Sequence, residues 1–197
     1  MRIIGITGPS GAGKSLLTDY ISKRGIPCID ADEVYHGMLR TPTRCVEALR
    51  KTFGDGIVAP DGSVDRAALG AIVFNSPERL ELLNATVLPY VLYDIRLMIA
   101  AIAKNGYRTV VVDAPTLIES GFNRECNTVI SVLAPKELRI ERIQARDSIS
   151  RERAELRVSA QREDEFYRSN SHYVLENAND EEGFKHDIDA LLSELGL

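Results

Sequence analysis

One glycine-rich segment near the start of the chain constrains its fold more than any other feature. The segment Gly8-Pro9-Ser10-Gly11-Ala12-Gly13-Lys14-Ser15 fits the pattern G-x-x-x-x-G-K-[ST]. Residues 3–7 before it are apolar enough for a buried strand, and residues 16–25 after it have the periodicity of a helix. A strand, a glycine loop and a helix form the context that this pattern requires, so the segment predicts a phosphate-binding loop, or P-loop, rather than a chance match.

The chemistry of such a loop predicts a nucleoside triphosphate as ligand. Glycines let successive backbone N–H groups point inward at an anion, and the start of the next helix adds the positive end of its dipole. Lys14 is expected to reach the β- and γ-phosphates, and the Ser15 hydroxyl is expected to hold Mg²⁺. A dinucleotide-binding loop is excluded because no G-x-G-x-x-G can be drawn through Gly8, Gly11 and Gly13. The expected nucleotide contacts along this segment are Gly8, Ser10, Gly11, Ala12, Gly13, Lys14, Ser15 and Leu16.

The distribution of apolar runs predicts an α/β fold. Five short runs have the composition of strands, with helical patterns between them, which is typical of a parallel sheet. They cover residues 3–7, 26–29, 109–112, 128–133 and 173–175. The second and third runs are separated by nearly 80 residues, far more than one crossover helix needs. This interval therefore predicts an inserted helical substrate domain within a chain of 197 residues.

Turn and cap residues divide that interval into helices. Thr41 and Pro42 predict the N-cap and first residue of a helix that ends near residue 53. Asp65 and Ser76 predict the caps of two more helices. Pro89 is expected to kink or restart the last of these, because a proline inside a helix removes a backbone hydrogen bond.

Charge and composition exclude several classes of protein. The net charge of −5 gives no indication of a nucleic-acid or membrane partner. Three scattered cysteines without C-x-x-C spacing predict buried thiols in a reducing cytoplasm. Gly and Pro interrupt the N-terminus before a signal peptide can form, and Asp94 and Arg96 make residues 91–103 an amphipathic helix rather than a membrane span. We expect a cytoplasmic monomer or weak homo-oligomer.

Carboxylates follow two of the predicted strands. Asp30 and Asp32 come directly after the second strand, at the sheet edge where ligands bind in parallel α/β folds. They could activate a hydroxyl or touch metal-bound water, or they could cap the helix that follows, and their spacing does not separate these alternatives. Asp113 ends the third strand and is interpreted as an acid that holds Mg²⁺ through water, with a solvated turn residue before Pro115 as the alternative.

Residues 135–168 are helical in pattern and rich in arginine. Three of the arginines share one helix face at spacings i, i+3 and i+7: Arg139, Arg142 and Arg146. Such a face could be a lid that neutralises phosphate charge in the transition state, or a solvated helix with Arg–Glu pairs. We expect the solvated arrangement for most of these arginines and the lid role for Arg142 and Arg146.

Several further segments resemble the dephospho-coenzyme A kinase family, and the resemblance extends over nearly the whole chain. They are Asp30-Ala31-Asp32, Phe53-Gly54, residues 61–69, residues 72–74, residues 113–119, residues 138–147 and Gln161. The resemblance implies an α/β P-loop kinase fold, in which helices flank a five-stranded parallel sheet. It implies a nucleotide-binding core of residues 1–31, 105–135 and 169–197, a helical acceptor domain of residues 32–104 and a helical lid of residues 136–168.

The resemblance also implies an activity and its residues. ATP, with Mg²⁺, would phosphorylate the ribose 3′-hydroxyl of dephospho-coenzyme A, which is the final step of coenzyme A synthesis. Asp32 would be the catalytic base, Lys14 and Arg142 would contact phosphates, and Ser15 would hold the metal. Further nucleotide contacts are expected from Arg146 and Asn177. Acceptor contacts are expected from Asp32, Leu88, Pro89, Pro115, Leu117 and Glu119.

The chain departs from the family pattern at a few positions. Leu88 stands where the family commonly has His before Pro, Thr116 replaces a usual leucine, and Asn179 replaces a glycine. Nucleoside monophosphate kinases and shikimate kinases are rival interpretations, but the long insertion after Asp32 argues against both. A regulatory GTPase would usually show an N-K-x-D motif, and this sequence has none.

Overall fold

The computed structural model describes residues 1–73, 76–178 and 181–197, so Phe74 and Asn179 lie outside the described residues. The chain divides into two compact units. One unit consists of Met1–Cys28 and Gly106–Leu197, and the other consists of Ile29–Asn105.

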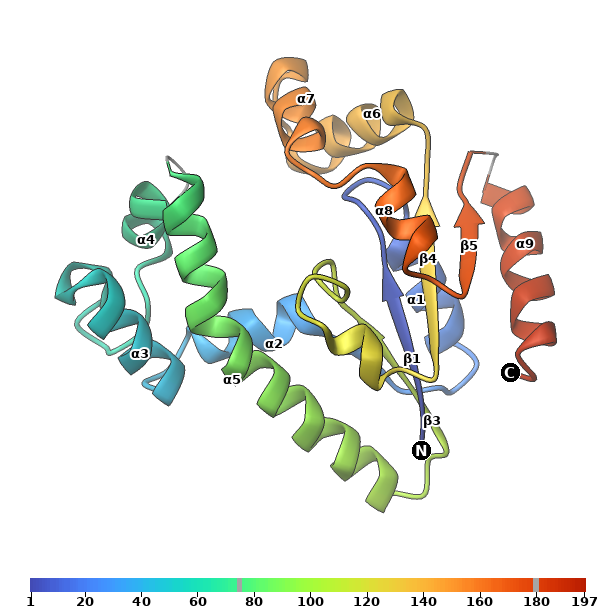
Figure 1. The fold of residues 1–197 in the computed structure, drawn as a ribbon, viewed down its shortest axis with the longest axis horizontal. Helices are drawn as coiled ribbons and strands as arrows, with labels where there is room; N and C mark the ends of the chain where they lie inside the picture. Colours follow the sequence, from blue (N-terminus) through green and yellow to red (C-terminus); the bar gives the residue numbers. More distant parts are fainter. Residues whose placement is uncertain (74–75, 179–180) are drawn as a thin grey trace. The chain divides into compact units, whose positions relative to one another are not determined.

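Five parallel strands form a single sheet, as the sequence predicts (Figure 1). The strands are β1 (Arg2–Thr7), β2 (Cys28–Asp30), β3 (Thr109–Asp113), β4 (Thr128–Leu133) and β5 (Tyr173–Glu176). Their order in the sheet is β2-β3-β1-β4-β5. Ile6 of β1 pairs with Asp113 of β3 and with Ile130 of β4. The β1–β3 register therefore brings Asp113 level with the strand end that leads into the P-loop.

Two helices bury the apolar side chains on one face of this sheet. Helix α1 (Lys14–Ser22) follows the P-loop, and α9 (Glu181–Glu194) ends the chain. Leu17 and Ile21 of α1 and Phe184 and Ile188 of α9 are fully buried in one cluster with side chains of β1, β3, β4 and β5. This cluster fixes α1, and with it the P-loop, on the sheet.

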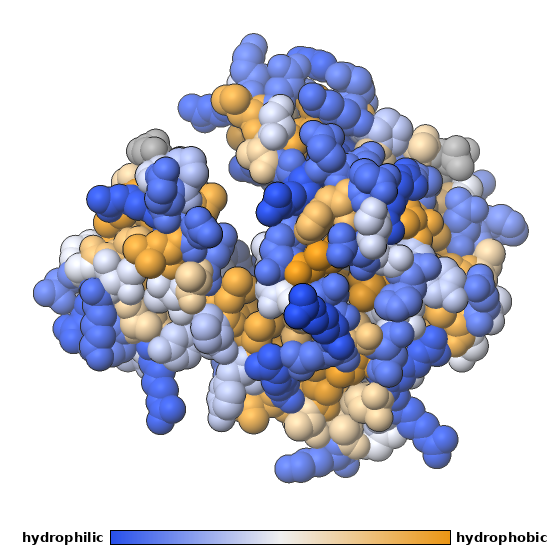
Figure 2. Space-filling model, viewed as in Figure 1, coloured by the Kyte–Doolittle hydropathy of each residue, from blue (hydrophilic) through white to orange (hydrophobic). Residues whose placement is uncertain are grey.

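The arginine-rich segment forms three helices after β4. They are α6 (Lys136–Asp147), α7 (Arg151–Ser159) and α8 (Asp164–Ser169). Helices α6 and α7 share a small core of their own, made of Ile140, Ile143, Ala154 and Val158. Hydrophilic side chains predominate over these two helices on the face shown in Figure 2. The pair is therefore a helical hairpin that is held internally by four apolar side chains.

The second unit is helical. It contains α2 (Ala31–Met38), α3 (Arg44–Phe53), the short η1 (Asp55–Ile57), α4 (Arg66–Val73) and α5 (Pro77–Lys104). In the described part of the chain, α5 alone is long and apolar enough to cross a membrane by length and composition. Every fourth residue along one face of α5 is buried, and these residues form a stripe. Helices α2, α3 and α4 contact α5 in this unit. The stripe consists of Leu83, Val87, Val91, Ile95 and Ile99.

The helix boundaries confirm two predicted caps and correct two other predictions. The side chains of Asp65 and Ser76 cap α4 and α5 as expected. The N-cap of α3 is Thr43 rather than Thr41, because the Thr43 hydroxyl accepts the Val46 N–H at 3.2 Å. Of the two alternatives at Pro89, the restart is wrong, since α5 runs unbroken through this residue, and the kink stays a prediction. The proline removes only one hydrogen bond, and buried residues on both sides of it hold the helix together.

The three cysteines are free thiols. Cys45 is buried, and Cys28 and Cys126 are half-buried. Burial raises the pKa of Cys28 and of Cys45 to about 11 and the pKa of Cys126 to about 12. All three therefore remain protonated and unreactive near neutral pH.

Candidate functional site

The P-loop connects β1 to α1 and turns tightly at its glycines. Gly11 and Gly13 have φ angles of 79° and 100°, which lie in the left-handed region that side-chain-bearing residues rarely adopt. A Cβ atom on Gly11 would lie 2.7 Å from the Arg139 carbonyl oxygen, and one on Gly13 would lie 2.1 Å from Asn177 Nδ2. Both positions therefore require glycine for two reasons, the backbone conformation and the close approach of α6 and of the residue after β5.

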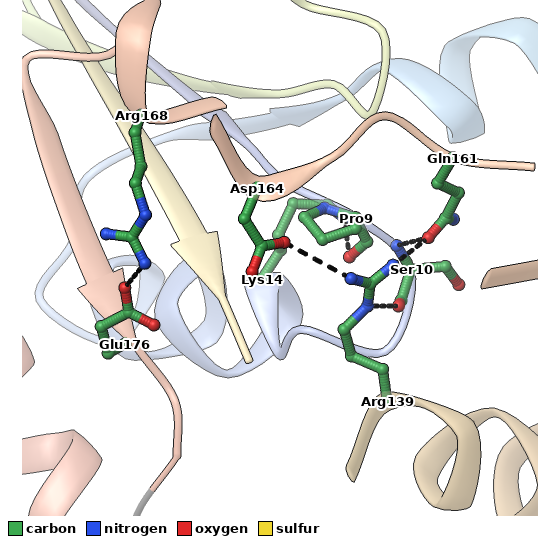
Figure 3. A network of polar contacts seen from close by, with 8 residues as sticks. All are labelled: Pro9, Ser10, Lys14, Arg139, Gln161, Asp164, Arg168 and Glu176. Carbon is green, nitrogen blue, oxygen red and sulfur yellow. Dashed lines mark hydrogen bonds and ion pairs between the residues drawn. The ribbon is translucent and has the colours of Figure 1, made fainter. Parts of the chain in front are cut away.

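Positive charge gathers at the start of α1. Lys14 is the first residue of the helix, and its ammonium donates to the Gly8 carbonyl at 2.8 Å. It also donates to the Pro9 carbonyl at 3.4 Å (Figure 3). Ser15, the next residue, is exposed. The helix N-terminus adds its own positive potential, so this end of α1 is suited to an anion such as a phosphate.

One face of α6 lies against the P-loop. Arg139 Nε donates to the Ser10 carbonyl at 3.3 Å, and Arg142 Nη1 donates to the Gly11 carbonyl at 3.3 Å. Arg146 Nη2 donates to the Ser10 hydroxyl, also at 3.3 Å. The spacing i, i+3 and i+7 places the three guanidinium groups on one face, and that face contacts loop residues 10 and 11.

The expectation that most of these arginines are solvated is right for α7 and wrong for Arg139. On α7, Arg151 pairs with Glu137 and Glu155 at the surface, and Arg153 is exposed. Arg139 is only 5% exposed, because packing of α6 on the loop covers it. The sequence did carry the signal, since Arg139 shares a helix face with Arg142 and Arg146.

Burial sets the electrostatics of this face. It lowers the pKa of Arg139 and of Arg142, since desolvation disfavours the charged form. A hydrogen bond to Asp147 raises the pKa of Arg146. Arg139 and Arg142 therefore place two partly desolvated positive charges beside the P-loop, an arrangement that favours a bound polyphosphate.

Asn177 supports both the loop and Arg142. Its side chain is buried, with Nδ2 donating to the Ala12 carbonyl at 2.8 Å and Oδ1 accepting from Arg142 Nη2 at 3.1 Å. Its backbone N–H donates to the Leu133 carbonyl at 2.7 Å, which anchors it to the end of β4. Asn177 thus connects the P-loop and Arg142 to the end of β4.

The structure separates the roles of the two carboxylates after β2. Asp30 is the N-cap of α2, and its Oδ1 accepts the backbone N–H groups of Asp32 at 2.8 Å and Glu33 at 3.1 Å. Asp32 lies in the first turn of the same helix and is exposed. The capping role that the sequence left open therefore belongs to Asp30, and the Asp32 side chain is not the N-cap.

Asp113 is held against α1. Its Oδ2 accepts the Thr18 hydroxyl at 2.9 Å, and Thr18 lies one helical turn after Ser15. The alternative of a solvated turn residue is therefore wrong, because Asp113 is half-buried and hydrogen-bonded. The Thr18 hydrogen bond thus ties Asp113 to the helix that begins with Lys14 and Ser15. The Ser15 hydroxyl and the Asp113 carboxylate are oxygen donors of the kind that Mg²⁺ prefers.

The expected acceptor residues differ in their surroundings. In the unit of residues 29–105, Leu88 is half-buried and Pro89 is exposed, both in the middle of α5. In the other unit, Glu119 is exposed, and the Pro115 carbonyl accepts the Thr7 hydroxyl at 3.2 Å. Leu117 is fully buried, so its side chain has no surface for a ligand, which corrects the expectation of direct contact.

A family model described as dephospho-CoA kinase matches residues 2–182. The chain belongs to the dephospho-CoA kinase family. A dephospho-CoA kinase of Anaeromyxobacter dehalogenans is 33% identical over 195 residues, which cover 99% of this chain and 92% of that protein. A dephospho-CoA kinase of Symbiobacterium thermophilum is 40% identical over 161 residues, which cover 82% of this chain and 67% of that protein.

Solved structures agree with this membership. The protein TT1252 from Thermus thermophilus has a TM-score of 0.79 and 34% identity, covering 98% of this chain and 97% of that one. Dephospho-CoA kinase from Campylobacter jejuni has a TM-score of 0.73 and 26% identity, covering 99% and 98%. A shikimate kinase from Acinetobacter baumannii, at 17% identity, covers 98% of this chain and 94% of that one with a TM-score of 0.54, and shows the shared fold alone. The predicted P-loop kinase fold is confirmed.

Proposed function

We propose that this chain transfers the γ-phosphoryl group of ATP to the ribose 3′-hydroxyl of dephospho-coenzyme A, giving coenzyme A and ADP. The observation that carries the proposal is the family match over residues 2–182. It is supported by a P-loop against which α6 places Arg142. This reaction is the final step of coenzyme A synthesis.

On the nucleotide side, we assign ATP to residues 1–31, 105–135 and 169–197. The backbone N–H groups of the P-loop and the Lys14 ammonium would bind the β- and γ-phosphates, with phosphate oxygens replacing the carbonyls that Lys14 now contacts. Arg142 would neutralise charge that develops on the transferred group. Arg146 and Asn177 would assist, the first through Ser10 and the second by holding Arg142.

We assign Mg²⁺ to the Ser15 hydroxyl and, through water, to Asp113. When bound, the ion would supply positive charge that neutralises the phosphate oxygens of the nucleotide. The chain's own contribution is to fix the donors. The Thr18 hydrogen bond orients the Asp113 carboxylate, and the first turn of α1 presents Ser15.

On the acceptor side, we assign dephospho-coenzyme A to residues 32–104, with Asp32 as the catalytic base. Because phosphoryl transfer has a loose transition state, the carboxylate mainly orients the 3′-hydroxyl and takes its proton late. Leu88, Pro89, Pro115 and Glu119 are proposed to contact the acceptor. Leu117 would support Pro115 from the core, since it is fully buried.

We further propose that residues 136–168 act as a lid that closes over the bound substrates. The protein would work in the cytoplasm as a monomer or weak homo-oligomer, without a nucleic-acid or membrane partner. The net charge of −5 supports the last point, because it would repel polyanionic surfaces.

The test is ADP release with dephospho-coenzyme A measured against a panel of nucleosides, nucleoside monophosphates and shikimate. We expect the highest kcat/KM with dephospho-coenzyme A. A higher kcat/KM with shikimate or a nucleoside monophosphate would contradict the proposal.

A further inference from the structure

Arg139 and Gln161 hold the backbone of one P-loop residue between them (Figure 3). The Ser10 N–H donates to Gln161 Oε1 at 3.2 Å, and Arg139 Nε donates to the Ser10 carbonyl at 3.3 Å. Arg139 Nη2 also donates to Gln161 Oε1, at 2.7 Å. These three hydrogen bonds form a closed ring, which we call the Ser10 clasp.

Arg139 has one further polar partner besides the Ser10 clasp. The guanidinium borders a cavity of about 300 Å³ whose lining includes Gln161 and Asp164, and it pairs with Asp164 at 3.6 Å. The Asp164 side chain is 47% exposed, so water screens this ion pair and makes it weak. The Arg139 side chain is only 6% exposed, and its shortest contact is the bond to Gln161. The position of the guanidinium is therefore set chiefly by the Ser10 clasp.

The Ser10 clasp joins the helical hairpin of α6 and α7 to the backbone of Ser10, beside the contacts that Arg142 and Arg146 make with the loop. Arg139 belongs to α6, and Gln161 follows α7, while Ile143 and Val158 pack in the core between these helices. Ser10 precedes Gly11, whose left-handed turn lies directly against the α6 backbone. Fixing both backbone groups of Ser10 therefore fixes the turn that shapes the rest of the loop.

We propose that Arg139 and Gln161 are positioning residues that hold the P-loop in its phosphate-binding shape before the nucleotide arrives. A loop that is already ordered loses less conformational entropy on binding, so the Ser10 clasp increases nucleotide affinity without touching the nucleotide. This inference rests on the nucleotide part of the proposed function and is independent of the acceptor.

The test is the affinity of the full chain for ADP with Mg²⁺, measured by isothermal titration calorimetry. Arg139→Lys keeps the charge but cannot donate in two directions as the planar guanidinium does. Gln161→Leu removes the shared acceptor. Because each change removes hydrogen bonds that involve a charged group, each should raise the Kd for ADP about tenfold. The double variant should also bind about tenfold more weakly, rather than a hundredfold, because both changes open the same ring.

Two controls separate a loss of loop positioning from a loss of protein stability and from a direct effect on catalysis. Ile143→Val removes a methyl group from the core between α6 and α7 and should lower the melting temperature while leaving the Kd for ADP unchanged. With all substrates saturating, kcat of the two clasp variants should stay within about twofold of the native value, since the loop is then ordered by the nucleotide. If Arg139→Lys does not fold, Gln161→Leu in the half-buried connection after α7 carries the test.

Three results would overturn the inference. They are native ADP affinity in Arg139→Lys or in Gln161→Leu, additive effects in the double variant, and an equal loss of affinity in Ile143→Val. A native chain that binds ADP but does not phosphorylate dephospho-coenzyme A would contradict the proposed function without contradicting the role of the Ser10 clasp.

Discussion

The groups that we propose to act in catalysis are held in different ways in the two units. In the unit that carries the P-loop, Arg142 donates to the Gly11 carbonyl and to Asn177, and Asn177 in turn donates to the Ala12 carbonyl. In the unit of residues 29–105, the carboxylate of Asp32 is exposed on a helix that a neighbour, Asp30, already caps. Substitutions in the first unit should therefore divide between affinity and turnover according to the contact that they remove, whereas a substitution at Asp32 should affect turnover alone.

Lys14→Ala should have the largest effect, because we propose that the Lys14 ammonium acts in both binding and the transition state. Loss of a cation at the transferred phosphate typically reduces the rate by about 10³–10⁵-fold, and we expect a decrease of that order in kcat/KM for ATP. Lys185→Ala is the control and should be close to native, because Lys185 is a partly exposed helix residue of the same unit that pairs with Glu181 one turn earlier. Steady-state kinetics that show near-native kcat/KM for Lys14→Ala would remove the P-loop from the mechanism.

Asp32→Asn should reduce kcat by about 10²–10⁴-fold, the usual contribution of a general base, while ADP affinity and melting temperature stay native. The matched control is Asp30→Asn, which should keep nearly native activity because asparagine caps a helix as well as aspartate does. Native kcat in Asp32→Asn, or a larger loss in Asp30→Asn, would reverse the roles assigned to these two carboxylates.

Arg142→Ala should reduce kcat by about 10²–10³-fold, the magnitude found when one transition-state donor is removed. Nucleotide affinity should fall much less, because the P-loop and Lys14 remain. Arg153→Ala on the exposed face of α7 should be neutral. A large loss of nucleotide affinity in Arg142→Ala with a native kcat would contradict a role of Arg142 in the transition state.

The sequence predicted those features best that are determined by contacts between residues close together in the chain. The P-loop, its flanking strand and the cap at Asp65 depend on residues close in sequence, and all of these were predicted. The burial of Arg139 depends on the packing of α6 on residues more than a hundred positions earlier, and the only local sign of it was the helix face that Arg139 shares with Arg142 and Arg146. The misplaced cap at Thr41 is a local error instead, because the Thr43 hydroxyl accepts the N–H of Val46 only three residues later.

Leu88→His should have the smallest effect and should be confined to the acceptor. The imidazole restores the polar group that the family commonly has before this proline, and one added hydrogen bond corresponds to about a two- to tenfold lower KM for dephospho-coenzyme A. ATP affinity should not change. Steady-state kinetics with each substrate varied in turn would show an effect limited to ATP if Leu88 had been assigned to the wrong substrate.

The most direct test of the whole account is the position of the transferred phosphate. The chain is incubated with ATP, Mg²⁺ and dephospho-coenzyme A, and the products are examined by ³¹P nuclear magnetic resonance and mass spectrometry. We predict one new phosphomonoester on the ribose 3′-oxygen, formed in equal amount with ADP. ADP formed without a phosphorylated acceptor, or a phosphate at any other position, would contradict the account.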